Sequence, residues 1–188
     1  TKAEPVLSFG LPPIDHAFPG FKTGDLAVLY GLPFCKNLSF LLSVRCQLPK
    51  EEGGLNSAAI YVDGGNTFNP YAISAIAQQY NLDPRSTLER IFVSRAFTAY
   101  QLSALIFETL ENALKRYRSR LALISDITAL FLDRDVPTKE AMDVFNKAAV
   151  YLSELAARKD VIIVASCFPR GRFRRSLFLE SVLLGRAS

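Results

Sequence analysis

Short, continuously apolar runs alternate along this chain with longer segments in which apolar residues recur every three or four positions. The apolar runs cover residues 26–30, 58–62, 90–94, 121–125 and 161–166. Because they are continuous rather than alternating, each predicted strand should be covered on both faces. The pattern predicts an α/β fold in which a mostly parallel sheet lies between layers of helices.

Helical spacing fills the intervals between the predicted strands. A short helix is expected near Pro12, and longer ones over residues 37–47, from Pro70 onward, over 98–117, and from the loop after Asp133 to about residue 158. Proline at the start of a helix replaces an N–H that has no partner there in any case, so Pro70 marks a helix start. The last apolar segment, residues 176–184, is expected to form a short terminal strand or hairpin.

Length and composition narrow the class of protein. The chain has 188 residues, of which 49% are hydrophobic, and this suits one α/β domain with its own core. No apolar run approaches the roughly 20 residues that span a bilayer, so no membrane partner is expected. Three scattered cysteines argue against a disulfide framework, and a single histidine makes a zinc site improbable. We expect a soluble intracellular protein without a metal site.

Positive charge is concentrated in one hexapeptide. The formal net charge is +4, and the stretch Arg170-Gly-Arg-Phe-Arg-Arg175 contributes four arginines. Alternating arginines can contact a phosphate backbone while an intervening aromatic ring stacks on a base. This favours DNA binding, with low sequence specificity, by Arg170, Arg172, Phe173, Arg174 and Arg175. A solvated basic loop, or one that pairs with an acidic partner, is the alternative.

Ligands of open α/β sheets bind beyond the carboxyl ends of the strands. Those ends are predicted here at residues 31–36, 63–66, 126 and 166–175, and all of them contain polar residues or glycine. The sequence therefore predicts that any ligand site lies at this edge.

The first of these ends has the position of a phosphate-binding loop but little of its chemistry. Such a loop reads G-x-x-x-x-G-K-[ST], whereas Gly31-Leu-Pro-Phe-Cys-Lys-Asn37 keeps only the first glycine and a lysine, Lys36. Pro33 has no N–H to offer a phosphate, and Asn37 replaces the hydroxyl that would hold Mg²⁺. We expect no ordinary ATP binding here. Asp126 could face Mg²⁺ or could instead hydrogen-bond a neighbouring loop, and the residues leave both readings open.

Several motifs, in order and spacing, resemble the ATPase core of the RecA/RadA recombinase family. The likeness covers nearly the whole chain and rests on Phe9-Gly-Leu-Pro-Pro-Ile-Asp15, Ile60-Tyr-Val-Asp-Gly-Gly-Asn-Thr-Phe-Asn-Pro70, Ser94-Arg-Ala-Phe97 and Leu123-Ile-Ser-Asp-Ile-Thr-Ala-Leu130. The resemblance implies a three-layer RecA-like fold with residues 1–188 as a single core domain. It also implies that the strand over residues 26–30 lies at the centre of the sheet.

The departures from the family pattern imply that catalysis is lost. Gly65 stands where the family has its catalytic glutamate, and Cys167-Phe168 replaces the polar pair that ends the fifth strand. Removing a general base and the phosphate cradle together should leave little hydrolysis. The resemblance thus implies a pseudo-ATPase without ATP or Mg²⁺ as cofactor. Its vestigial nucleotide site would comprise Gly31, Lys36, Asn37, Asp63 and Asp126.

The resemblance also implies a surface that pairs with another recombinase-like protein. It would be lined by Ser94, Ala96, Phe97, Leu102 and Leu105, for which ordinary core packing is the alternative. The expected function is a non-catalytic accessory factor in homologous recombination that binds DNA and forms a heterodimer with a recombinase or its paralogue. A divergent ATPase and a RecA-fold regulatory subunit outside DNA repair are the alternatives. The expected location is the nucleus in a eukaryote and the cytoplasm otherwise.

Overall fold

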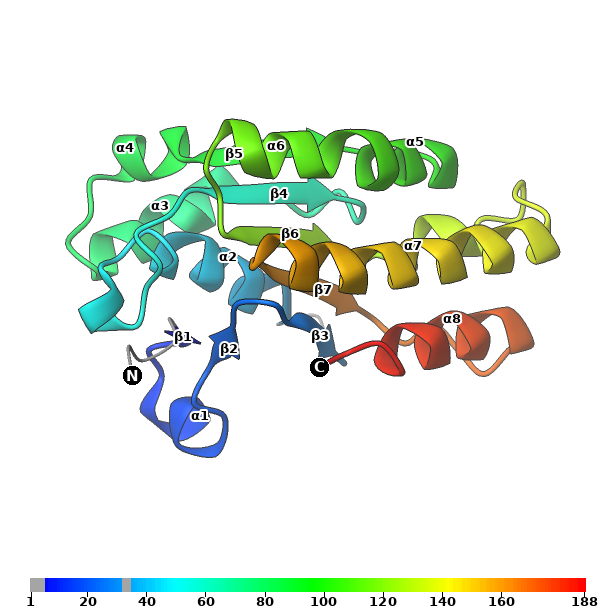
Figure 1. The fold of residues 1–188 in the computed structure, drawn as a ribbon, viewed down its shortest axis with the longest axis horizontal. Coiled ribbons are helices and arrows are strands. Elements are labelled where there is room, and N and C mark those ends of the chain that lie inside the picture. Colours follow the sequence, from blue (N-terminus) through cyan, green and yellow to red (C-terminus); the bar gives the residue numbers. More distant parts are fainter. Residues whose placement is uncertain (1–5, 32–34) are drawn as a thin grey trace.

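Five parallel strands form the central sheet of the computed structural model, which describes residues 6–31 and 35–188 (Figure 1). The strand order is β3-β7-β6-β4-β5, and each neighbouring pair is parallel. The strands are β3 (Leu26–Tyr30), β4 (Ala59–Asp63), β5 (Ile91–Arg95), β6 (Leu121–Ser125) and β7 (Ile162–Cys167). The predicted α/β fold with a parallel sheet is confirmed.

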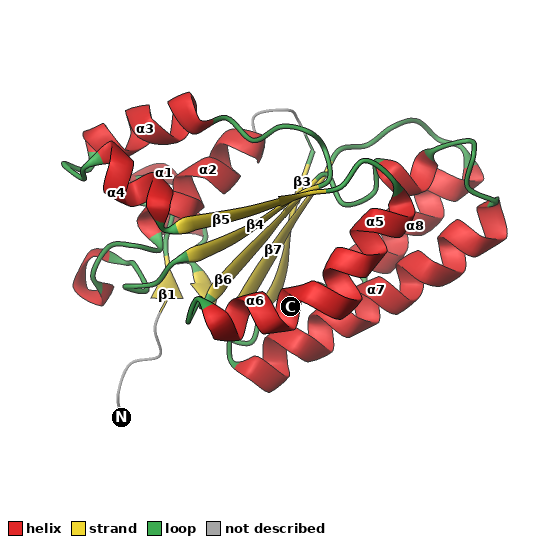
Figure 2. Cartoon of the chain, turned by 90° about the horizontal axis from the view of Figure 1, so that it is seen from above, coloured by secondary structure: helices red, strands yellow, loops and turns green. Residues whose placement is uncertain are grey.

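Helices cover both faces of the sheet, as the continuous apolar strands predict (Figure 2). One layer holds α1 (Pro12–Ala17), α2 (Cys35–Arg45), α3 (Pro70–Gln79) and α4 (Pro84–Glu89). The other holds α5 (Ala99–Ala104), η2 (Leu105–Thr109), α6 (Leu110–Arg116), α7 (Thr138–Lys159) and α8 (Arg174–Leu184). Short 3₁₀ turns, η1 (Lys50–Glu52) and η3 (Leu130–Leu132), lie in the connections. Nowhere in the described ranges is a helix long and apolar enough to cross a bilayer.

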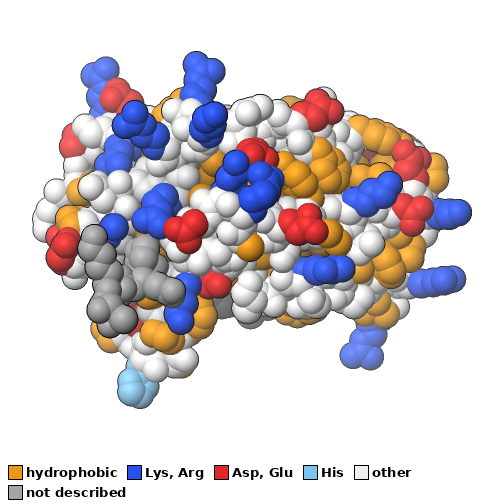
Figure 3. Space-filling model, in the orientation of Figure 1, with side chains coloured by type: hydrophobic (Ala, Val, Ile, Leu, Met, Phe, Trp, Pro, Cys, Tyr) orange, Lys and Arg blue, Asp and Glu red, His pale blue; other side chains and the backbone are white. Residues whose placement is uncertain are grey.

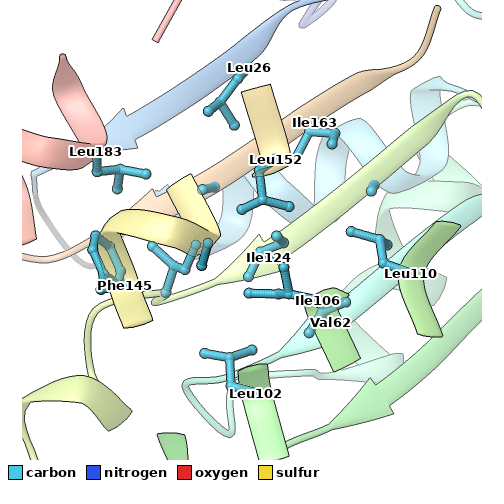
Figure 4. Packing of buried hydrophobic residues seen from close by; sticks show 14 of the residues in the cluster. Leu26, Val62, Leu102, Ile106, Leu110, Ile124, Phe145, Leu152, Ile163 and Leu183 are labelled. Atoms are coloured by element: carbon cyan, nitrogen blue, oxygen red, sulfur yellow. The ribbon is translucent and has the colours of Figure 1, made fainter. Parts of the chain in front are cut away.

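Alternation along each strand divides the apolar residues between two cores. In β4, Ile60 and Val62 belong to the core beneath α5–α8, whereas Ala59 and Tyr61 belong to the core beneath α2 and α3. The first core is the larger, and Figure 4 shows strand residues such as Ile124 meeting helix residues of that layer. Successive side chains of a strand point to opposite faces, so a strand between two helical layers must be apolar throughout.

Polar caps set the helix starts that the sequence indicates. The side chain of Asn69 accepts hydrogen bonds from the N–H groups of Tyr71 and Ala72, just before Pro70 begins α3. Asp83 caps α4 in the same way by accepting from the N–H of Ser86 at 2.8 Å. These caps satisfy N–H groups that have no partner within the helix.

The helix expected over residues 98–117 is a continuous helical run whose middle segment, η2, is a π-helix. Its large buried residues, Leu102, Ile106, Leu110 and Leu114, are spaced four apart. On a regular α-helix such a spacing drifts around the axis, because one turn takes 3.6 residues. The wider π turn reduces that drift, so the buried stripe stays on the sheet.

The strand β3 lies at the edge of the sheet rather than at its centre, which corrects the expectation from the resemblance. Within the described residues it pairs only with β7, and Tyr30 at its end is 45% exposed. An apolar strand sequence indicates that both faces of the strand are covered. It does not indicate whether the strand has a neighbouring strand on one side or on both. The order of the strands is set by the crossover connections, which the hydrophobic pattern does not encode.

The C-terminal segment forms the helix α8, so the expectation of a terminal strand or hairpin was wrong. Its buried positions are Ser176, Leu179, Glu180 and Leu183, a helical spacing. Two of these four are polar, so the buried stripe does not read as apolar in the sequence.

The N-terminal segment adds a small antiparallel pair, β1 (Val6–Leu7) with β2 (Phe21–Lys22), that the sequence pattern did not indicate. Strands of two residues are too short to show a periodic pattern. An aromatic cluster of Phe9, Phe18 and Phe21, with ring centroids 4.9 to 6.3 Å apart, packs this pair beside the sheet.

Candidate ligand site at the carboxyl edge of the sheet

The carboxyl ends of β3, β7, β6 and β4 lie next to one another, so the structure brings together the four ends that the sequence singled out. Polar groups there bond to each other. The N–H of Gly31 donates to the carbonyl of Cys167 at 3.2 Å, and the N–H of Asp126 donates to Ser166 Oγ at 2.8 Å. Hydrogen bonds thus join neighbouring strand ends at this edge, including those that carry the candidate carboxylates Asp63 and Asp126.

Asp63, the last residue of β4, is fully buried and fully bonded. Its oxygens accept from the N–H groups of Thr67 (2.9 Å) and Phe68 (3.1 Å), from Ser125 Oγ (2.8 Å), and from Arg95 Nε (3.1 Å). Burial alone would raise the pKa of Asp63, but these hydrogen bonds and the Arg95 charge outweigh it and lower the pKa. Asp63 therefore stays ionised and has its charge balanced from within the protein.

Asp126 follows β6 and is 2% exposed, with a positive φ of 47° that aspartate tolerates better than most residues. Both of its oxygens accept from the guanidinium of Arg170: Nη1 lies 2.7 Å from Oδ1, and Nη2 contacts Oδ2. This hydrogen bond raises the pKa of Arg170. Of the two roles considered for Asp126, the structure shows the one in which it bonds a neighbouring loop.

The residues that would form a phosphate loop are only partly described. Residues 32–34 lie outside the described part of the chain, so the expected effects of Pro33 and Phe34 stay predictions. Gly31 has a φ of +131°, which a residue with a Cβ rarely adopts. Lys36 and Asn37 are exposed in the first turn of α2.

Gly65 lies too close to its neighbours to be replaced by a larger residue. A Cβ at this position would meet Asp126 Cβ at 2.8 Å and Thr67 Cγ2 at 3.2 Å. A contact shorter than 3.0 Å is closer than a real Cβ atom approaches its neighbours, so the neighbouring atoms would have to shift. The backbone geometry at this edge has therefore adapted to glycine, and a glutamate side chain cannot be accommodated without movement.

Both candidate carboxylates at this edge are already paired with arginine, which bears on whether a divalent cation could bind there. Such a cation takes oxygen ligands, chiefly carboxylates and phosphates. At the described part of this edge, however, each of the two carboxylates, Asp63 and Asp126, already has an arginine partner. Among the described residues no cluster of three or more His, Cys, Asp or Glu side chains could hold a metal ion.

The arginine-rich hexapeptide, residues 170–175, divides into outward and inward side chains. Arg172 and Arg174 are exposed and Phe173 is 50% exposed, whereas Arg170 turns inward to Asp126. Arg175 is half-buried and donates from Nη1 to the carbonyl of Val136 at 3.0 Å, and burial lowers its pKa. On the face of the molecule in Figure 3, positive and negative side chains are interspersed, so no single basic surface covers it.

A part-buried polar contact attaches α8 to the end of β3. Tyr30 donates from its hydroxyl to Glu180 Oε2 at 2.7 Å, and Ser176 donates to Glu180 Oε1 at 2.8 Å. The bond to Glu180 raises the pKa of Tyr30. The sequence reasoning missed Tyr30, Glu180 and Arg95 as residues of this edge. Their positions after or beside predicted strand ends offered a signal for Tyr30 and Arg95, but none for Glu180.

The expected partner surface is only partly on the outside. Ala96 and Leu102 are buried, at 2% and 0% exposure, and lie in the larger core. Ser94 and Leu105 are half-buried, and Phe97 is 64% exposed. A groove of about 390 Å³ runs beside β5 and is lined by residues of β5 and α6, among them Ser94. The open side of β5 therefore offers an accessible surface.

Comparison with known proteins gives matches consistent with this architecture. The Rad51 family model matches residues 9–167. A curated protein described as "DNA repair protein RAD51 homolog", from Solanum lycopersicum, is 32% identical over 114 residues. That alignment covers 60% of this chain and 33% of the relative. The matched region thus spans about a third of the length of the relative.

Proposed function

The chain belongs to the Rad51 family, and from that premise we propose that it is a non-catalytic accessory factor of homologous recombination and DNA repair. In this proposal it binds DNA through the arginine-rich hexapeptide and pairs with another RecA-like protein. The observation that carries the proposal is that some arginines pair with buried carboxylates whereas others are exposed. Arg95 and Arg170 balance the carboxylates of the former nucleotide site, while Arg172 and Arg174 face solvent.

The proposed absence of ATP hydrolysis follows from the groups that surround Asp63 and Asp126. A catalytic site needs a free general base and a place for the charge of the nucleotide and its cation. Asp63 and Asp126 are each held by an arginine, and a glutamate at position 65 would require its neighbours to shift. These contacts support a scaffold role in place of hydrolysis.

DNA binding is supported by the outward half of the hexapeptide. Arg172 and Arg174 flank the half-exposed ring of Phe173, and Gly171, with a φ of +100°, provides a turn between Arg170 and this segment. Contacts between guanidinium groups and phosphates carry no sequence information, and an exposed ring can stack on a base of a single strand. The ligand class is therefore DNA bound with low sequence specificity.

Substitution of the two outward arginines tests this directly. We expect Arg172→Ala/Arg174→Ala to weaken binding of a fluorescein-labelled single-stranded oligonucleotide, measured by fluorescence anisotropy at several salt concentrations. Each lost phosphate contact should reduce the slope of log K against log salt by about 0.7 on a single strand. The matched control is Arg85→Ala/Lys115→Ala, which removes the same charge from exposed positions of α4 and α6.

The control makes the outcome interpretable. Equal loss of affinity in both double variants would show that only the net charge matters, and would contradict a binding role for the hexapeptide. If wild-type protein does not bind DNA even at low salt, the function lies outside DNA repair, as for a RecA-fold regulatory subunit.

Pairing with a RecA-like protein is supported by the open side of β5. Phe97 (64%), Tyr100 (56%) and Val93 (40%) are large exposed side chains close together in the sequence, and Val93 lines the groove beside β5. A strand edge with free backbone groups can accept an extended segment of another chain, whose side chains then fill the adjacent groove. We propose such a segment of a recombinase or paralogue as the occupant.

Charge placed on this surface should block pairing. Phe97→Glu is expected to abolish capture of a recombinase partner in a pull-down with purified proteins, since a carboxylate would be desolvated in the contact. Tyr71→Glu is the control, because Tyr71 is an 84% exposed aromatic residue on α3. Retained capture by Phe97→Glu would contradict the proposed surface.

A further inference from the structure

The contact between Arg170 and Asp126 joins the loop after β7 to the end of β6, and it has a consequence for DNA binding. We propose that this contact is an autoinhibitory latch: Asp126 competes with phosphate for Arg170 and holds the loop against the sheet until nucleic acid takes Arg170 away. The proposal rests on the proposed function for the identity of the ligand. The latch itself rests on geometry alone.

The charge of the buried Asp126 carboxylate is balanced by Arg170. The Asp126 side chain is 3% exposed, and the hydrogen bonds that its two oxygens accept among the described residues both come from the Arg170 guanidinium. The neighbouring Ser166 hydroxyl accepts from the backbone N–H of Asp126 and not from its carboxylate. A buried carboxylate without a partner is strongly disfavoured, so the protein holds Arg170 firmly.

Arg170 remains reachable from outside. Its side chain is 40% exposed, whereas the carboxylate beneath it is buried. Arg170 belongs to the same hexapeptide as the exposed Arg172 and Arg174, so a phosphate bound by those two would come close to its partly exposed side chain. Arginine binds carboxylate and phosphate with the same two-pronged geometry, so the two anions are true competitors.

Release of the loop can be local because both ends are anchored independently. Residues 162–167 belong to β7 in the sheet, and α8 is held by the buried Leu179 and Leu183 and by the Tyr30–Glu180 bond. Between these anchors Gly171, with a φ of +100°, provides a turn that only glycine adopts readily. The loop can therefore move without loss of the fold.

Asp126→Asn tests the latch because it removes the charge and keeps the shape. Without the competing carboxylate, affinity for a labelled single-stranded oligonucleotide should rise about tenfold at low salt. The gain should disappear in Asp126→Asn/Arg170→Gln, because it requires a freed Arg170. Glu154→Gln is the matched control, since it removes one negative charge at an exposed position of α7.

A second readout reports on the loop without DNA. Trypsin cleaves after arginine, and mass spectrometry can follow cleavage of the Arg170–Gly171 bond. Asp126→Asn should speed this cleavage several-fold, and Glu154→Gln should not. If Asp126→Asn does not fold, Arg170→Lys serves instead. It keeps the charge and the cleavage site but loses the two-pronged contact, so smaller gains in cleavage and affinity are expected.

The two readouts separate the latch from the proposed function. Faster cleavage together with tighter DNA binding supports the latch. Unchanged cleavage in Asp126→Asn, or faster cleavage without tighter binding in a protein that does bind DNA, overturns it. Absence of DNA binding in every variant overturns the proposed DNA ligand, and with it the competition with phosphate.

Discussion

At the scale of single residues, two arginines change what the carboxyl edge can do. Asp63 and Asp126 stand where the predicted strands end, and the sequence identified both. Their partners, Arg95 and Arg170, could not be assigned from the sequence, because those contacts depend on which strands are neighbours and on the path of the loop after β7. The sequence indicates that a carboxylate lies at the end of a strand. Only the fold shows which arginine balances its charge.

Asp63 should contribute to stability in a pH-dependent way. Its pKa in the folded state is lowered, so its contribution is present above the unfolded pKa of about 3.9 and is lost as the pH falls through the folded pKa. We expect Asp63→Asn to lower the free energy of unfolding by about 1–3 kcal/mol at pH 7. Urea unfolding at pH 7 and below pH 4 measures the difference between the two proteins.

That difference should shrink at the lower pH, where the wild-type carboxyl becomes protonated. Asp143→Asn, at an exposed position, should change stability by less than about 0.5 kcal/mol at either pH. A difference between wild type and Asp63→Asn that does not depend on pH would contradict the role assigned to the ionised carboxylate.

Restoring the family glutamate at position 65 should not restore hydrolysis. The added Cβ would lie 2.8 Å from Asp126 Cβ, so Gly65→Glu should destabilise the protein by about 1–3 kcal/mol. A phosphate-release assay with ATP and Mg²⁺ should show no turnover above the buffer. Turnover by Gly65→Glu would mean that the rest of the site is intact, which contradicts the scaffold interpretation.

At the scale of elements, the predictions succeeded where periodicity is strong. The strand expected over residues 121–125 has those bounds in the structure, and the helix expected to end near residue 158 ends at Lys159. The helix α8 was missed because Ser176 and Glu180 occupy buried positions beside Leu179 and Leu183. Their burial is explained by the bond to Tyr30, a residue 150 positions away from Glu180 in the chain.

The packing of α8 can be measured by shortening one buried side chain. Leu183 is fully buried, so Leu183→Ala should lower the free energy of unfolding by about 2–5 kcal/mol. Leu177, on the same helix, is 49% exposed, and Leu177→Ala should cost less than about 0.5 kcal/mol. Equal effects of the two substitutions in a thermal melt would show that α8 does not pack as described.

At the scale of the whole molecule, layering was predictable but strand order was not. Continuous apolar runs and helical stripes require two covered faces, and the resemblance to recombinases named the fold. The location of β3 at the edge came only from the structure, because it depends on crossover connections between distant segments. The same connections bring Asp63, Asp126 and residues 170–175, which include the proposed DNA contact, to one edge of the sheet.

The most direct test is to titrate labelled single-stranded DNA with the wild-type protein and to monitor binding by fluorescence anisotropy. The titration is done once with Mg²⁺ alone and once with Mg²⁺ and ATP. The account predicts binding that weakens as salt rises and has the same affinity with and without ATP, because the carboxylates that would engage the nucleotide are held by Arg95 and Arg170. Affinity that depends on ATP would contradict it and would indicate a working nucleotide site.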